Sequence, residues 1–339
     1  MRSAQFVAMG MFACGLLLGQ PSRLFANDSM ATIGAGGLQF QKTDDVRMER
    51  EDLYLSPQEV RVSYAFRNLT DHDVRMTIAF PMPDIDVLRM SEAPHEFHLS
   101  SRDGDIFDFH VYVNGLEIVS ALDARAYRSD QPDQEVTAIL KKYKQPLLAE
   151  TKERPSEKPD IKALVAEGLF DDEALHPNWF LKVTFHWEQV FPAGQTIQIS
   201  HRYKPVVGGT RTSFADALDE WGHFFVPWCP DQAFADAAKA LPSDTNGLVR
   251  LSELDYILTT GANWAGPIGQ FRLEINKAGA DLLSLCPIPG LKLQRRGQSF
   301  VAEAAQYRPS SDIKLMYLYR ACDKAPCGLG ANFPGYPRR

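Results

Sequence analysis

The sequence has few cysteines, no excess of basic residues and, beyond its first residues, no long apolar run. Five of its 339 residues are cysteine, and acidic side chains outnumber basic ones 43 to 36. An acidic chain repels phosphate backbones and anionic lipid, so nucleic acid is not an expected partner. No later stretch approaches the roughly 18 apolar residues of a spanning helix, so we expect no transmembrane segment in the mature chain.

Residues 1–26 have the pattern of a secretory signal peptide. A basic residue comes early, and the apolar run from Phe6 to Leu18 is too short to span a bilayer comfortably. We therefore expect export, to the periplasm or the medium, with cleavage after Ala26. Cleavage removes two arginines and no acids, so the net charge changes from −7 to −9. A lipoprotein signal at Cys14 and an uncleaved anchor are the alternatives.

Four cysteines remain after this cleavage, and an even number in an oxidising compartment favours disulfides. We expect the pairs Cys229–Cys286 and Cys322–Cys327, because the last two lie close together in the chain. The alternative is a zinc site made by the same four residues. It lacks the usual C-x-x-C spacing, so we expect no metal site.

The common catalytic motifs are also absent. Gly34, Gly36 and Gly37 lie close together, as in a phosphate loop, but such a loop needs a helix after its glycines. Residues 38–42 alternate like a strand instead, so we interpret the glycines as a turn. No serine lies in a G-x-S-x-G context. We therefore assign no catalytic residue and expect no cofactor.

Most of the chain alternates apolar and polar residues with a period of two, which is typical of half-buried strands. Examples are Val60, Val62 and Tyr64, and later Leu181 and Val183. The pattern predicts a mainly β protein: an antiparallel β-sandwich with a helical insertion and a smaller β-rich (α+β) C-terminal part. The predicted units are the sandwich at 27–129 plus 177–208, the helical insertion at 130–176, the C-terminal domain at 209–320 and a mobile cysteine-containing tail at 321–339.

The histidines do not indicate a metal site. On a strand, His95 and His98 would face opposite sides and could not easily reach one ion. His201 shares an apolar strand face with Ile199 and Tyr203. A buried, hydrogen-bonded histidine is the interpretation we favour there, and a functional histidine is the alternative.

The best candidate for binding is the loop from Thr259 to Gly269. Trp264 could stack on a sugar ring or anchor a partner protein, and Asn263 could hydrogen-bond beside it. The alternative, which we favour, is that Trp264 packs between two β layers. Trp221 and His223 lie in an aromatic cluster that is either core or pocket, and we include both as candidate binding residues.

Several long stretches resemble the bacterial family named domain of unknown function 4424. They are NDSMATIGAGGLQF, EDLYLS, VRVSYAFRN, WEQVFPAGQTIQISHRYKPVVGG and YILTTGANWAGPIGQFRLEINK. The resemblance covers about residues 27–318 and implies an exported bacterial protein. It implies no catalytic residues, and it does not reach the tail that carries Cys322.

We expect an exported, non-catalytic binding or structural module of the bacterial cell envelope, with an envelope glycan or an envelope protein as its partner. The alternative is a secreted hydrolase that acts on envelope glycans. A hydrolase would need two carboxylates facing each other across a groove, and Asp216, Asp219 and Glu220 beside Trp221 are the first acids to inspect. The sequence does not predict the ligand or the oligomeric state.

Overall fold

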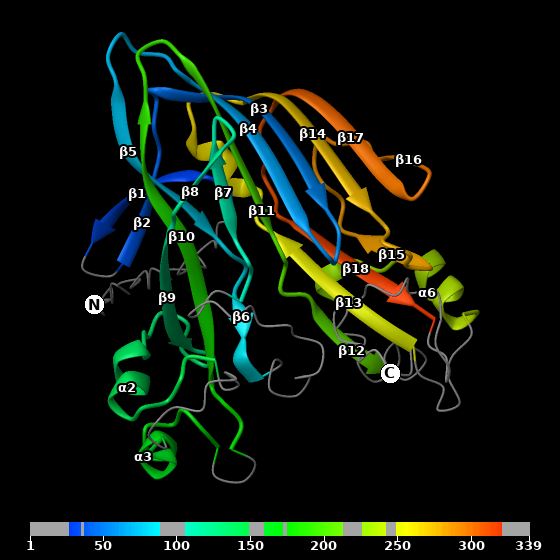
Figure 1. The fold of residues 1–339 in the computed structure, drawn as a ribbon. Coiled ribbons are helices and arrows are strands. Elements are labelled where there is room, and N and C mark those ends of the chain that lie inside the picture. The colour runs from blue at the N-terminus through cyan, green and yellow to red at the C-terminus, as the bar shows by residue number, and fades with distance from the viewer. Residues whose placement is uncertain are drawn as a thin grey trace, which may run out of the picture.

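The structure of the protein is a computed structural model that describes residues 27–34, 37–88, 106–148, 159–171, 175–212, 226–241 and 249–320. These residues form a mainly β fold with three sheets, as predicted (Figure 1). The predicted signal peptide, the tail and the cysteines 322 and 327 lie outside the described residues.

The first sheet has six strands, all in antiparallel pairs. Gly34 ends β1 and Gly37 begins β2, so a strand follows the glycines, as expected. The long strand β10 pairs with β5 and β6 along one edge and with β9 along the other. The strands are β1 (Ser29–Gly34), β2 (Gly37–Gln41), β5 (Val74–Pro81), β6 (Ile85–Asp86), β9 (Ala121–Arg128) and β10 (Trp179–Phe191).

The second sheet has eight strands, in the order β16-β17-β14-β3-β4-β11-β7-β8. β14 runs parallel to β3, and the other described pairs of this sheet are antiparallel. Asn114 and Gly115 both have positive φ in the tight β7–β8 turn, as the Asn-Gly pair predicts. The strands are β3 (Val46–Leu55), β4 (Val60–Asn68), β7 (His110–Val113), β8 (Leu116–Ile118), β11 (Thr196–Tyr203), β14 (Ile268–Asn276), β16 (Gln294–Arg296) and β17 (Ser299–Tyr307).

A smaller sheet, in the order β12-β13-β18-β15, lies beside the helix α6 (Gln232–Lys239) (Figure 1). A disulfide joins Cys229 to Cys286, the pair that the sequence predicts. Cys229 follows the short 3-10 helix η2 (Val226–Trp228). The strands are β12 (Gly208–Thr212), β13 (Val249–Tyr256), β15 (Leu282–Leu285) and β18 (Ile313–Tyr319).

The predicted insertion contains two short helices, α2 (Thr137–Lys142) and α3 (Ile161–Ala166). Both lie beyond one end of β9, away from the eight-stranded sheet (Figure 1). The indole nitrogen of Trp179 donates to the main-chain oxygen of Leu147, 2.9 Å away, which ties this region to the start of β10.

The core lies where the inner faces of the two larger sheets meet, because alternation directs every second side chain inward. The His201 ring of β11, for example, lies 5.0 Å from Phe80 of β5 and 5.3 Å from Trp187 of β10. In the described part of the chain, no helix is long and apolar enough to cross a membrane.

The eight-stranded sheet continues across the domain boundary predicted at residue 209. β14, β16 and β17 come after that boundary in sequence, yet they extend the sheet that begins with β3 and β4. Residue 209 therefore does not separate two sheets. Alternation within β14 and β3 predicts two strands but not their pairing, since a parallel pair joins segments that are distant in the sequence.

Candidate functional site

A β-bulge in β3 determines which of its side chains face the core. The register with β4 shifts between Met48 and Arg50, so Glu49 is an extra residue. Met48 is buried before the bulge, and Glu51 is buried after it. Since one inserted residue reverses the alternation, Arg50 and Asp52 face outward instead of into the core.

Gly269 allows β14 to approach this bulge. A Cβ atom at position 269 would lie only 2.5 Å from the main-chain oxygen of Glu49, closer than real contacts allow. Glycine at this position therefore allows β14 to pair with β3 beside the bulge.

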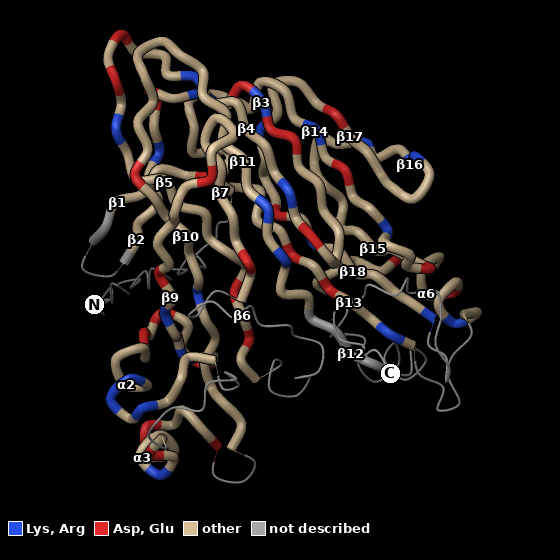
Figure 2. The backbone as a smooth tube through the Cα atoms, viewed as in Figure 1, with Lys and Arg blue, Asp and Glu red and all other residues tan. Residues whose placement is uncertain are grey.

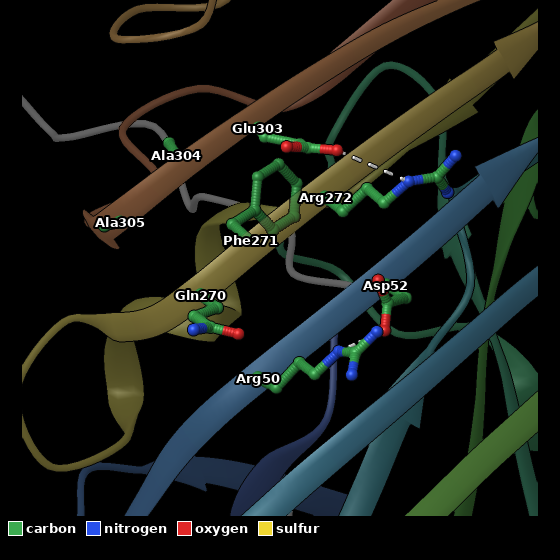
Figure 3. A pocket seen from close by; sticks show the side chains of 8 residues that line it. All are labelled: Arg50, Asp52, Gln270, Phe271, Arg272, Glu303, Ala304 and Ala305. Atoms are coloured by element: carbon green, nitrogen blue, oxygen red, sulfur yellow. Dashed lines mark ion pairs between the residues drawn. The ribbon is translucent and has the colours of Figure 1, made fainter.

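The outer face of the sheet carries a groove over β3, β14 and β17, with a volume of about 490 Å³ (Figure 3). The parallel register of β3 and β14 sets Arg50 opposite Gln270 and Asp52 opposite Arg272. The lining residues are Arg50, Asp52, Gln270, Phe271, Arg272, Glu303, Ala304 and Ala305.

Charges of both signs alternate in the groove. Arg50 Nε lies 2.6 Å from Asp52 Oδ2, and Arg272 Nε lies 3.9 Å from Glu303 Oε1 (Figure 3). Arg272 also donates through Nη2 to Glu274, 2.7 Å away, and this hydrogen bond lowers the pKa of Glu274. Exposed ion pairs of this kind contribute little to stability. Each charged group is therefore able to leave its ion-pair partner and bind a polar ligand instead.

The polar character continues across the sheet. Basic and acidic residues recur along β3, β14 and β17 (Figure 2). Arg61 of β4 lies 4.3 Å from the ring centre of Tyr54, on the strand that also carries Arg50 and Asp52. The groove is thus part of a wide polar face that presents donors, acceptors and the Tyr54 ring.

The opposite, inner face of β3 contributes to a fully buried polar cluster. Asn27 Nδ2 donates to the two carboxylate oxygens of Glu51 at 3.1 and 3.2 Å, and the Tyr64 hydroxyl donates to Asn27 Oδ1. His201 Nε2 lies 3.0 Å from both carboxylate oxygens of Asp28. The histidine is therefore buried and hydrogen-bonded, which is the interpretation that we favoured from the sequence.

Burial dominates the protonation of this cluster. It raises the pKa of Glu51 to about 8, and the nearby Asp28 and Asp52 raise it further against the hydrogen bond from Asn27. Burial also raises the pKa of Asp28, although the charge of His201 and its hydrogen bond act in the other direction. The pKa of Tyr64 is well above its ordinary value for the same reason.

The predicted binding loop contacts this buried cluster and not the groove. Trp264 is 3% exposed, and its indole nitrogen donates to the main-chain oxygen of Asp28. Its ring lies 4.4 Å from Phe66 and 6.1 Å from Phe191, between the two sheets. A buried ring offers no surface on which a sugar could stack. Trp264 therefore packs between the two β layers, which is the alternative that we favoured from the sequence.

Asn263, like Trp264, contacts the N-terminal segment instead of the groove. It ends the 3-10 helix η3 (Thr259–Asn263), and its Nδ2 donates to the Ser29 hydroxyl at 3.0 Å. Trp221 and His223 lie outside the described residues, as do His95, His98 and the acids 216, 219 and 220. Within the described part of the chain, no group of three His, Cys, Asp or Glu side chains is arranged to hold a metal ion.

The groove residues were not identified from the sequence. The available signal was the alternation of charged residues in REDLY (50–54) and QFRLE (270–274), which indicates two strands with polar outer faces. Nothing in that alternation predicts that the two strands are neighbours, so their charges could not be combined into one site.

The fold and the groove define a β-sandwich protein with a polar surface groove. The chain belongs to the family described as domain of unknown function DUF4424, whose match covers residues 26–316. The resemblance noted from the sequence is therefore correct. No curated protein matches the chain.

Solved proteins with a distant structural likeness to this chain include the following two. One is to a Legionella pneumophila protein proposed to bind nutrients, with a TM-score of 0.42 and 13% identity over 86% of this chain and 70% of that one. The other is to an M1 zinc metallopeptidase from Deinococcus radiodurans, with a TM-score of 0.28 and 10% identity over 82% of this chain and 43% of that one. Both are too distant to carry an argument about function.

Proposed function

We propose that this protein is an exported, non-catalytic binding module of the bacterial envelope, and that its ligand occupies the groove over β3, β14 and β17. The observation that carries the proposal is the set of paired arginines and carboxylates that lines this groove. Its volume of about 490 Å³ is that of a small-molecule or oligosaccharide subsite. The lining side chains project from paired strands, which hold them in place.

The chemistry of the groove favours a polar, uncharged ligand. Asp52 and Glu303 accept hydrogen bonds, whereas Arg50, Arg272 and the Gln270 amide donate them. Sugar hydroxyls both donate and accept, so a glycan matches the full set. The two carboxylates would repel a strongly anionic ligand, and the two arginines would repel a strongly cationic one. An envelope glycan therefore fits better than a charged polymer.

The proposal of export rests on the signal-like residues 1–26 and is consistent with the Cys229–Cys286 disulfide. Disulfides persist in oxidising compartments and are rare in reducing ones. Cell fractionation, followed by mass spectrometry of the mature N-terminus, tests this part separately from ligand binding.

The first prediction is that Arg272→Ala weakens binding to envelope glycans. Each charged hydrogen bond contributes about 1.5–3 kcal/mol, so the loss of this side chain is expected to reduce affinity at least tenfold. Co-sedimentation with isolated peptidoglycan and envelope polysaccharide measures the effect. The matched control is Arg202→Ala, an exposed arginine on the same sheet face that lies on β11, away from the groove.

Equal binding by both variants would place the ligand elsewhere, and no binding by the folded wild-type protein would reject the glycan proposal. Release of soluble sugar fragments would instead favour the hydrolase alternative. Trp264→Ala is a poor probe of binding, because a buried ring affects the fold first.

A further inference from the structure

The first described residues of the chain lie in the core. Asn27, Asp28 and Ser29 are each 0% exposed. Asn27 bonds Glu51 and Tyr64, Asp28 bonds His201, and the Trp264 indole holds the main chain at Asp28. The expected cleavage point after Ala26 therefore directly precedes a buried, hydrogen-bonded segment.

Glu51 is the acidic residue of this cluster that has no ion-pair partner among the described residues. His201 lies within ion-pairing distance of Asp28, but the charges that shift the pKa of Glu51 are the carboxylates Asp28 and Asp52, and both oppose its ionisation. The other titratable groups that act with Glu51 are the hydroxyls of Tyr64, Tyr256 and Tyr307. A buried carboxylate without a cation stays protonated or is strongly destabilising.

The 3-10 helix η3, which packs near Asn27, contains a buried hydroxyl. The Thr260 hydroxyl is fully buried and has no hydrogen-bond partner among the described residues. Its neighbour Gly261 lies so near that a Cβ atom there would be 2.9 Å from Asn27 Nδ2. The helix η3 therefore packs against Asn27 and also carries a buried hydroxyl that has no hydrogen-bond partner among the described residues.

We infer that signal cleavage supplies the missing cation: the α-ammonium group of Asn27 becomes the internal counter-ion of Glu51. This inference rests on the export part of the proposed function. Hydrolysis of the Ala26–Asn27 peptide bond by a signal peptidase consumes one water molecule. It leaves a carboxylate on Ala26 and an amine on Asn27, and that amine takes up a proton.

The amine forms in the buried cluster that contains Glu51, because Asn27 is 0% exposed and its side chain bonds Glu51. The main-chain nitrogen of Asn27 is a few covalent bonds from Nδ2, which lies 3.1 Å from Glu51 Oε1. An ammonium group has three N–H donors, so it also satisfies acceptors that a peptide N–H cannot. The folded protein thus distinguishes the processed chain from the precursor, and the processed chain is the more stable one.

The test uses the full-length, exported protein with a Ser-Gly-Ser insertion between Ala26 and Asn27. The insertion moves the new amine about 10 Å along the chain. Mass spectrometry checks the N-terminus of each chain, and thermal unfolding at pH 7 gives its Tm. We expect the insertion to lower the Tm by about 5 °C or more when Glu51 is present, and to have little effect in the Glu51→Gln background.

Equal Tm losses in both backgrounds would show that the insertion acts sterically, and this would overturn the inference. A mature N-terminus other than Asn27 would also overturn the inference. If that protein were still exported, the proposed function would remain intact. Failure of export would reject the export proposal as well.

A second measurement does not depend on the inserted chain. In the normally processed protein, Glu51→Gln is expected to lower the Tm at pH 7, because it removes one partner of an ion pair. An unchanged or higher Tm would show that Glu51 has no cationic partner, and the inference would fail.

Discussion

Glu49 is one extra residue in β3, and it changes the side of the sheet on which the following charges lie. If Glu49 were paired as an ordinary strand residue, without the bulge, Arg50 and Asp52 would continue the inward series that begins with Val46 and Met48. With it, Glu51 enters the core and its two charged neighbours line the outer groove. A single bulge therefore creates both polar sites of the molecule.

Gly269 provides a test of the bulge. Gly269→Ala places a methyl group against the main-chain oxygen of Glu49, so β3 or β14 must shift. We expect the free energy of unfolding to fall by about 3 kcal/mol, the cost of overpacking a rigid site. Urea denaturation measures it. Gln270→Ala, at the exposed neighbouring position, is the control and is expected to change stability by less than about 0.5 kcal/mol.

Glu51 makes stability depend on pH when its cation is kept away. In the Ser-Gly-Ser insertion chain, folded Glu51 keeps its proton up to about pH 8, whereas the unfolded chain releases it near its ordinary pKa of 4.5. The folded state then binds more protons, so stability falls as pH rises between these values, by up to about 1.4 kcal/mol per pH unit.

Urea denaturation between pH 5 and pH 8 measures this slope, and Glu51→Gln in the same chain is the control. The variant lacks the titrating group, so we expect its slope to be smaller. Identical slopes in the two chains would exclude Glu51 as the source.

Elements were predicted well from the sequence where one residue pattern determines them. Alternation identified the strands that carry Val62, Leu181 and Ile199, and all three side chains are buried. Asp231 begins α6 by accepting a hydrogen bond from the Phe234 main-chain nitrogen, which a local sequence signal also indicates. These features depend on residues that are close together in the sequence, so they can be predicted without knowledge of the fold.

The disulfide acts at the scale of elements, because it joins the segment after η2 to the end of β15 across 57 residues. Replacing both cysteines, Cys229→Ala with Cys286→Ala, is expected to reduce stability by about 4 kcal/mol on the loop-entropy model. Urea denaturation of the double variant and of the reduced wild-type protein measures this cost. A loss under about 1 kcal/mol in both would show that the bond contributes little.

At the scale of the whole molecule, Trp264 connects both large sheets to the N-terminal segment. Trp264→Ala is expected to cost about 3–5 kcal/mol, the usual range for removing a buried aromatic ring. Trp264→Phe keeps a ring but loses the donor to the Asp28 carbonyl, so we expect a loss of about 1–3 kcal/mol. Thermal unfolding of the two variants separates packing from hydrogen bonding. Equal losses would assign the whole effect to the hydrogen bond.

The sequence by itself determined the β class, the strand faces, the Cys229–Cys286 pair and the family, because each depends on local pattern or on ordered motifs. Only the tertiary structure decided that β14 lies beside β3 and that Asn27 lies against Glu51. Both contacts join residues far apart in the chain, and alternation specifies the faces of a strand without naming its neighbour. The groove and the buried cluster depend on those neighbours, so neither was predictable from the sequence.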